Sequence, residues 1–110
     1  MSYRVISTDP FEREVKRLSR KYPSLKTDLQ TLFGQLEENP LVGSPLGKNC
    51  YKIRLAIKSK GKGKSGGGRI ITFVQIRNEK VFLVTLYDKG EKGTVSDDEL
   101  EQLLKMIGLK

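Results

Sequence analysis

The chain contains no histidine and no tryptophan, and Cys50 is its one cysteine among 110 residues. Without histidine, the zinc sites, serine triads and proton shuttles that use imidazole are excluded. A single cysteine cannot form an internal disulfide or a multi-thiolate metal site. We interpret Cys50 as a small, half-buried residue near a strand start, not as a nucleophile. We therefore expect no metal and no cofactor, and any proton transfer must come from Lys, Tyr or a carboxylate.

Long hydrophobic runs are also missing. No apolar segment approaches the roughly 20 residues that a membrane span needs, and the first residues lack the apolar core of a signal peptide. We therefore expect a cytoplasmic protein with no membrane contact. Its length of 110 residues, of which 36% are hydrophobic, predicts one domain over residues 1–110 with a modest core.

Negative charge is absent from the middle of the chain. Residues 39–78 hold nine Lys or Arg and no Asp or Glu, whereas the other residues hold twelve Lys or Arg against thirteen Asp or Glu. The formal net charge of +8 therefore comes from one cationic sector. A polyanion such as RNA is the natural partner of such a sector, because binding releases counterions from the phosphates. A solubilising basic surface is the simpler alternative.

The spacing of apolar residues predicts the order β-α-α-β-β-β-α, which places the chain in the α+β class. A short strand over residues 3–7 precedes two amphipathic helices over residues 9–22 and 25–38. These helices form a hairpin that covers one face of a sheet. Ser96 and Glu99 have the spacing of a capping box and begin a C-terminal helix.

Three strands of a curved antiparallel sheet are predicted between residues 50 and 89. In the first, apolar residues at 51, 53, 55 and 57 alternate with Lys52, Arg54, Ala56 and Lys58, which is typical of a half-buried strand. Residues 69–76 and 81–86 are apolar on both faces and indicate inner strands. Residues 58–68, rich in Lys and Gly, are expected to form a mobile loop.

This loop has one feature of a phosphate-binding P-loop, the sequence Gly63-Lys64-Ser65. The glycine required five residues before Gly63 is replaced by Lys58, and a strand follows where a P-loop opens a helix. We therefore reject nucleotide binding. Instead we expect non-specific contacts to a nucleic-acid backbone from five lysines: Lys48, Lys58, Lys60, Lys62 and Lys64.

A second set of residues suggests chemistry on RNA. Lys52 and Arg54 share one face of a strand, Arg69 begins the next strand, and Tyr87 and Lys89 lie at the end of the third. Ribonuclease cleavage needs a base for the 2′-OH, a cation for the phosphorane and an acid for the 5′ oxygen. Arg suits stabilisation of the phosphorane, and a lysine crowded by other cations has a lowered pKa that makes it suitable as the base. Each residue alone is better explained as a solvated strand cation.

The order of elements and three segments resemble the RelE/ParE superfamily of bacterial toxins. The segments are residues 50–55 (CYKIRL), 66–71 (GGGRII) and 81–92 (VFLVTLYDKGEK), which look most like the RelE/HigB-like mRNA interferase branch. The resemblance implies a small RelE-like, microbial ribonuclease-like fold. It also implies a type II toxin that cleaves translated mRNA in the 30S decoding site without metal and is held inactive by a cognate antitoxin.

Carried over by position, the resemblance assigns the catalytic roles to Lys52, Arg54, Arg69 and Lys89, with Arg69 stabilising the phosphate. The chain departs from relatives that use an aromatic residue or histidine near the C-terminus, and Tyr87 is the nearest substitute. The general base therefore stays undecided. Two alternatives stay open: a ParE-like inhibitor of DNA gyrase, and a non-catalytic basic RNA-binding protein or degenerate toxin.

Overall fold

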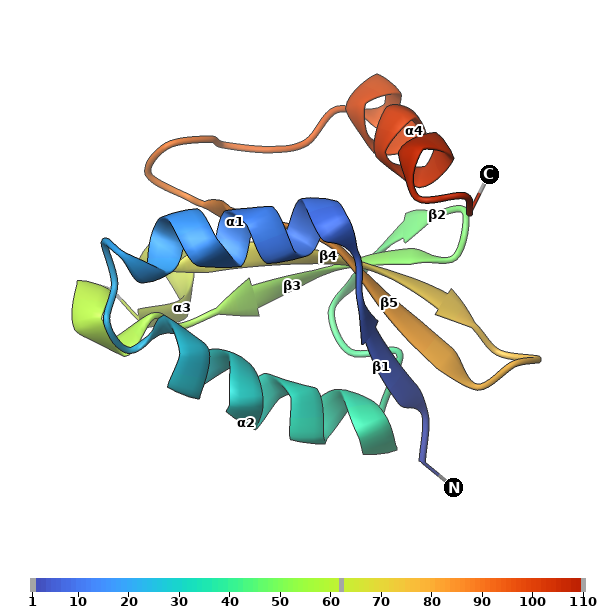
Figure 1. Cartoon of the computed structure of the whole chain (residues 1–110), viewed down its shortest axis with the longest axis horizontal. Helices are drawn as coiled ribbons and strands as arrows, with labels where there is room; N and C mark the ends of the chain where they lie inside the picture. The colour runs from blue at the N-terminus through green and yellow to red at the C-terminus, as the bar shows by residue number, and fades with distance from the viewer. Residues whose placement is uncertain (1, 62, 110) are drawn as a thin grey trace.

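The computed structural model describes residues 2–61 and 63–109, apart from the side chain of Lys64. Helices cover both faces of one sheet, with α1 and α2 on one side and α4 on the other (Figure 1). The strands are β1 (Arg4–Ser7), β2 (Ser44–Gly47), β3 (Cys50–Leu55), β4 (Gly68–Gln75) and β5 (Lys80–Asp88). The helices are α1 (Asp9–Ser19), α2 (Leu25–Glu38), α3 (Gly63–Gly66) and α4 (Asp97–Met106), with a 3₁₀ turn η1 at Lys58–Lys60.

The sheet has five strands in the order β1-β5-β4-β3-β2. Strands β3, β4 and β5 are antiparallel neighbours, as their alternating and apolar patterns predict. β1 pairs with β5 in parallel, a pairing that the sequence did not predict, so the sheet is mixed. The helical hairpin provides the long crossover that a parallel pair requires. The α+β class and the predicted order β-α-α-β-β-β-α are confirmed, with β2 and the short helix α3 as additional elements.

Each face of the sheet has its own apolar core. Phe11, Leu18 and Leu36 from the helical hairpin pack against Ile53, Leu55, Ile70 and Leu86 of the strands. On the opposite face, Leu100 and Leu104 of α4 pack against Cys50, Ile71, Val84 and Tyr87. Cys50 is therefore fully buried rather than half-buried. This arrangement explains why β4 and β5 are apolar on both faces.

Two segments differ from the expectations. The connection after β3, expected as a mobile loop, contains η1 and the short helix α3. The turn-rich segment before β3 contributes the additional edge strand β2, which pairs with the first half of β3. The capping box of α4 is confirmed, because the Ser96 Oγ accepts a hydrogen bond from the Glu99 N–H at 3.1 Å. Within the described part of the chain, no helix is long and apolar enough to cross a bilayer.

Candidate functional site

Three of the expected site residues form one row across the sheet. The strand register pairs Arg54 of β3 with Arg69 of β4, and Arg69 with Tyr87 of β5. Directly paired residues point to the same face of a sheet, here the face that α4 packs against. Lys52 belongs to the next row and faces the same side, opposite Ile71. The prediction that Arg69 returns to the Lys52–Arg54 pair is therefore confirmed at the level of strand register.

A bulge in β5 is needed for this row. Ile71 pairs with Thr85 and Thr72 pairs with Leu83, so Val84 is an extra residue between them. A bulge of this kind shifts the alternation of side chains by one position. Leu83 and Leu86 consequently face the helical hairpin, whereas Tyr87 faces α4. Without the extra residue, Tyr87 would lie on the wrong face to meet Arg69.

Arg69 is held by the connection that precedes it. Its side chain is only 5% exposed. Nη1 donates to the Gly68 carbonyl at 3.0 Å, and Nη2 donates to the Ser65 carbonyl of α3 at 3.2 Å. Between them lies Gly67, where a Cβ atom would stand 2.1 Å from the Leu55 carbonyl oxygen. Glycine therefore allows the chain to approach β3 closely and to place α3 beside the guanidinium.

Tyr87 is also covered, with 5% of its surface exposed. Burial raises the pKa of its phenol, and the nearby charges of Arg69 and Lys92 and the Thr94 hydroxyl oppose that rise. No hydrogen bond of normal geometry reaches the Tyr87 hydroxyl from the described residues. A neutral phenol next to an arginine can donate a proton to a leaving oxygen, which is the role of a general acid.

The remaining candidate site residues are more exposed to solvent. Arg54 is exposed and Lys52 is half-buried. Lys89 is exposed directly after β5, and its Nζ donates to the Gly93 carbonyl at 3.1 Å. The site thus has an accessible cationic half from β3 and a covered half from Arg69 and Tyr87.

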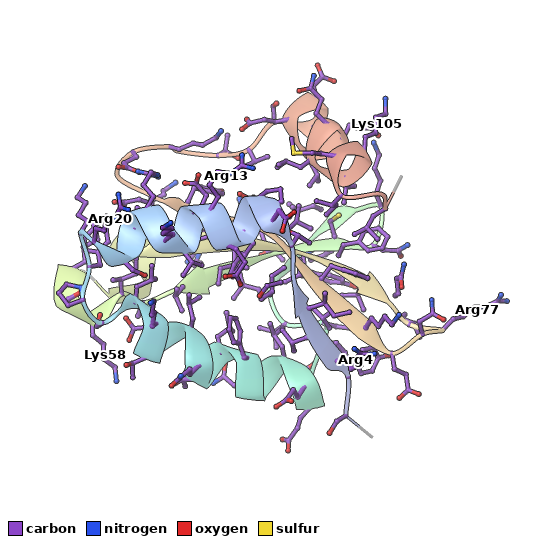
Figure 2. The ribbon with its side chains drawn as sticks, in the orientation of Figure 1. Arg4, Arg13, Arg20, Lys58, Arg77 and Lys105 are labelled. Carbon is purple, nitrogen blue, oxygen red and sulfur yellow. The ribbon has the colours of Figure 1, made fainter. Side chains whose placement is uncertain are left out.

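The five lysines expected to bind RNA are not equivalent. Lys58 is exposed at the end of the molecule near the start of α2, as the stick view shows (Figure 2). Lys48 pairs with Glu101 of α4, and Lys60 is 11% exposed and pairs with Asp88. Lys62 and the side chain of Lys64 lie outside the described residues. Lys60 therefore directs its charge into the protein rather than toward solvent.

The cationic sector of the sequence is also divided in space. Arg77 extends from the turn between β4 and β5, at the end of the molecule opposite Lys58 (Figure 2). Arg4, Arg13 and Lys105, which lie outside this sector in sequence, add positive charge elsewhere on the surface. The concentration of charge along the sequence therefore does not produce one continuous patch.

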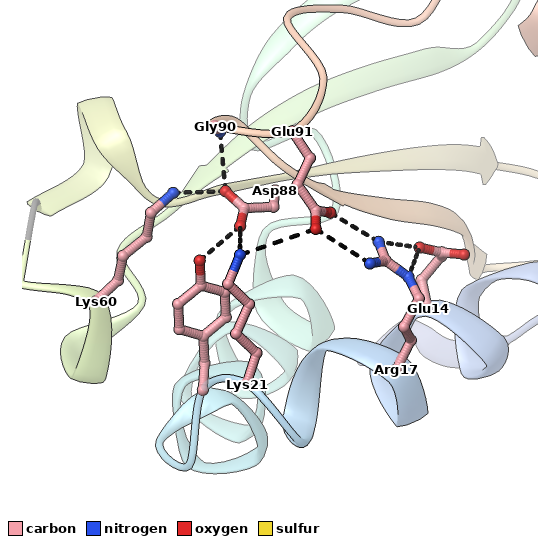
Figure 3. Close-up of polar contacts among 8 residues, drawn as sticks. Glu14, Arg17, Lys21, Lys60, Asp88, Gly90 and Glu91 are labelled. Carbon is pink, nitrogen blue, oxygen red and sulfur yellow. Dashed lines mark hydrogen bonds and ion pairs between the residues drawn. The ribbon is translucent and has the colours of Figure 1, made fainter.

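A buried carboxylate, Asp88, lies next to the row but was not expected at the site. It is 1% exposed and faces the helical hairpin. Its Oδ2 accepts from the Tyr22 hydroxyl at 2.6 Å, and its Oδ1 accepts from Lys60 Nζ and from the Gly90 N–H at 2.9 Å (Figure 3). Burial would raise the pKa of Asp88, but the hydrogen bonds from Lys60, Tyr22 and Gly90 outweigh it and lower the pKa to about 2.

An ion-pair network extends from Asp88 along α1. Lys21 Nζ lies 3.7 Å from Asp88 and 3.9 Å from Glu91, and Arg17 binds both Glu91 and Glu14 (Figure 3). The hydrogen bond from Arg17 lowers the pKa of Glu91, and the bonds from Glu91 and Glu14 raise that of Arg17. The turn that follows β5 is therefore attached to α1.

Sequence reasoning missed Asp88. The one signal that could have indicated it was a charged residue at the end of an apolar strand.

Metal ligands do not gather in the part of the chain that the structure describes. No three side chains of His, Cys, Asp or Glu come close enough to hold an ion there. The buried carboxylates Asp28 and Asp88 are instead satisfied by hydrogen-bond donors of the protein.

A family model matches nearly the whole chain. Residues 3–109 match the model described as the RelE toxin of the RelE/RelB toxin–antitoxin system.

Solved structures share the fold at low sequence identity. A doubly substituted Escherichia coli RelE toxin in the free state matches with a TM-score of 0.65 and 18% identity, over 97% of this chain and 99% of that one. A chain of the intact E. coli RelBE toxin–antitoxin complex matches with a TM-score of 0.61 and 19% identity, over 79% of this chain and 96% of that one. A chain of the toxin–antitoxin complex RelBE2 from Mycobacterium tuberculosis matches with a TM-score of 0.59 and 20% identity, over 80% of this chain and 99% of that one.

Proposed function

The chain belongs to the RelE family of toxins from type II toxin–antitoxin systems, and we propose that it is a ribosome-dependent endoribonuclease, an mRNA interferase of the RelE/HigB-like branch. The observation that carries this proposal is the row Arg54–Arg69–Tyr87 with Lys52 beside it. Two arginines and a neutral phenol on one sheet face match the needs of phosphodiester cleavage better than they match a structural role.

The proposed reaction is an attack of the ribose 2′ oxygen on the adjacent phosphorus. A base removes the 2′-OH proton, and Lys52 or Lys89 performs this step. Arg54 and Arg69 stabilise the charge of the phosphorane, because a guanidinium forms paired hydrogen bonds with phosphate oxygens. Tyr87 protonates the departing 5′ oxygen. The products are a 2′,3′-cyclic phosphate and a 5′-hydroxyl, and no metal takes part.

The proposed partners are mRNA in the 30S decoding site and a cognate antitoxin, in the cytoplasm. Lys48, Lys58 and Lys89 are exposed and supply contacts to the RNA backbone together with Lys62 and Lys64, whereas Lys60 is held by Asp88. The solved relatives that contain an antitoxin support the protein partner. A partner of opposite charge would complement a toxin with a net charge of +8.

The test is cleavage of translated mRNA in a purified translation system. We expect Arg69→Ala to lower the cleavage rate by about a hundredfold or more, the usual effect of removing a donor to a transition-state anion. Arg77→Ala is the matched control, since it removes the same charge from an exposed turn and should cleave like the wild type. Absence of cleavage with active ribosomes would refute the proposal.

The non-catalytic alternative gains support from one observation, the burial of Arg69 and Tyr87 at 5% exposure each. It predicts that RNA binding falls steeply with salt and that no strand scission occurs. In that case the wild type, Arg69→Ala and Arg77→Ala would all bind RNA without cutting it. The gyrase-inhibitor alternative predicts that the purified toxin inhibits the supercoiling of DNA by gyrase, which a supercoiling assay measures.

A further inference from the structure

The connection between β3 and β4 is anchored at its beginning by two buried carboxylates. Asp28 of α2 accepts from the Lys58 N–H at 3.0 Å and from the Ser24 hydroxyl at 2.7 Å. Asp88 of β5 accepts from Lys60 Nζ and from the Tyr22 hydroxyl. The Ser59 N–H donates to the Ser24 oxygen at 2.8 Å. The segment that was expected to be mobile is thus fixed to the core at η1.

The end of the same connection meets the arginine of the row. The Ser65 carbonyl in α3 receives a hydrogen bond from Arg69 Nη2. Two residues later, the Gly67 carbonyl receives one from the Lys89 N–H at 3.1 Å. Both ends of the connection therefore depend on the end of β5, where Asp88 and Lys89 lie side by side.

Asp88 and Tyr87 are consecutive residues that point to opposite faces of the sheet. Tyr87 pairs with Arg69, and Asp88 pairs with Gly68. Asp88 itself faces the helical hairpin, so it cannot touch an RNA bound on the face of the row. Any effect of Asp88 on cleavage must be transmitted through the backbone and through Arg69.

We propose that Asp88 is a positioning residue for RNA cleavage: by binding Lys60, Tyr22 and the Gly90 N–H it fixes the connection between β3 and β4, and this connection holds the Arg69 guanidinium in place. The proposal rests on the function proposed above. Loss of the carboxylate charge releases Lys60, which then stands as an unpaired ammonium at 11% exposure and must move toward water. The carbonyl of Ser65 moves with the segment, and Arg69 loses its orientation.

Asp88→Asn is the main variant, since the amide has the same shape and lacks the charge. Under saturating ribosomes we expect the cleavage rate to fall about ten- to a hundredfold, the range expected when a catalytic group is displaced by about 1 Å. The ribosome concentration for half-maximal cleavage should stay within about twofold, because Asp88 does not face the bound RNA and the substitution removes no side chain that contacts the ribosome. Asp98→Asn, at an exposed position of α4, is the matched control and should cleave like the wild type.

A double-variant comparison separates positioning from general damage. If Asp88 acts through Arg69, adding Asp88→Asn to Arg69→Ala causes no further loss, because the group to be positioned is gone. A loss of similar size in both backgrounds would overturn the proposal, as would an unchanged rate in Asp88→Asn alone. Tyr22→Phe removes one donor without changing the net charge. It gives the same comparison, with a smaller expected loss, if Asp88→Asn does not fold.

A measurement without RNA keeps the two proposals distinguishable. In nitrogen-edited NMR spectra, a held arginine shows a separate Nε–Hε signal that exchanges slowly with water. We expect this signal for Arg69 in the wild type and in Asp98→Asn, and its loss in Asp88→Asn. If the wild type shows no cleavage, the proposed function fails, and this signal still decides whether Asp88 positions Arg69. Persistence of the Arg69 signal in Asp88→Asn would contradict the positioning role.

Discussion

Asp88 should also determine how the stability of the protein depends on acid. Its carboxylate is 1% exposed and binds Tyr22, Lys60 and the Gly90 N–H. Replacing it with asparagine removes the one group in this cluster whose protonation changes between neutral and acidic pH. The pH dependence of the difference in stability between wild type and Asp88→Asn therefore reports on this carboxylate.

The expected size follows from the pKa. The pKa of Asp88 falls from its ordinary value of 3.8 to about 2 in the folded protein. A group whose folded pKa is depressed stabilises the fold above its unfolded pKa, and this contribution is lost as pH falls through the folded pKa. The shift corresponds to about 2 kcal/mol at neutral pH, decreasing to less than about 1 kcal/mol near pH 2.5.

Urea unfolding of both proteins at a series of pH values between about 7 and 2.5 tests this prediction. The wild type should be more stable at neutral pH, and its advantage over Asp88→Asn should shrink by about 1 to 2 kcal/mol toward acid. A constant part of the difference remains at all pH values, because asparagine pairs less well with Lys60. An advantage that does not change with pH, or that grows toward acid, would show that the Asp88 carboxylate is not stabilised in the folded state.

Three further predictions concern single positions. Tyr87→Phe removes a buried hydroxyl that no described residue reaches with a hydrogen bond of normal geometry. Urea unfolding should change by less than about 0.5 kcal/mol, whereas mRNA cleavage should fall about a hundredfold. Equal activity would exclude Tyr87 as the acid. Gly67→Ala places a Cβ atom 2.1 Å from the Leu55 carbonyl and should lower the melting temperature. Gly34→Ala in α2, whose Cβ meets nothing within 4 Å, should instead stabilise the protein by about 0.5 to 1 kcal/mol. A Gly67→Ala variant that is more stable than Gly34→Ala would contradict the close approach of Gly67 to β3. Leu104→Ala removes a side chain of α4 that is 1% exposed and should cost about 2 to 3 kcal/mol in urea unfolding, while a cost near zero would mean that α4 is not docked in solution.

The pattern of apolar residues predicted most of the fold for a physical reason. The faces of α1 and α2 and the alternation in β3 depend on local periodicity, which any packed helix or half-buried strand must satisfy. The parallel pairing of β1 with β5 has no such local signal, because either edge of the sheet can accept a short apolar strand. The helical turns inside the connection after β3 were missed because their glycines and lysines favour a loop by composition. Tertiary anchors at Asp28 and Asp88 outweigh this preference.

The candidate site was predicted in part. Antiparallel order was enough to bring Arg54 and Arg69 together. The position of Tyr87 in the same row depends on the extra residue Val84 in β5, and a bulge among consecutive apolar residues is invisible to an alternation test. The ion pair that occupies Lys60 could not be found either, because its partner Asp88 is 28 residues away and belongs to a strand whose register was unknown.

The last two residues of β5 have different electrostatic roles on the two faces of the sheet. They point to opposite faces, so that Tyr87 meets the arginines of the row and Asp88 meets the lysines of the helical side. If both side chains faced the row, the carboxylate would pair with Arg69 and compete with a phosphate for it. On the helical face the same charge is compensated by Lys60 and Lys21, so it stabilises the connection without neutralising the row. A buried acid one residue from Tyr87 is therefore compatible with an anion-binding site, because the sheet itself stands between them.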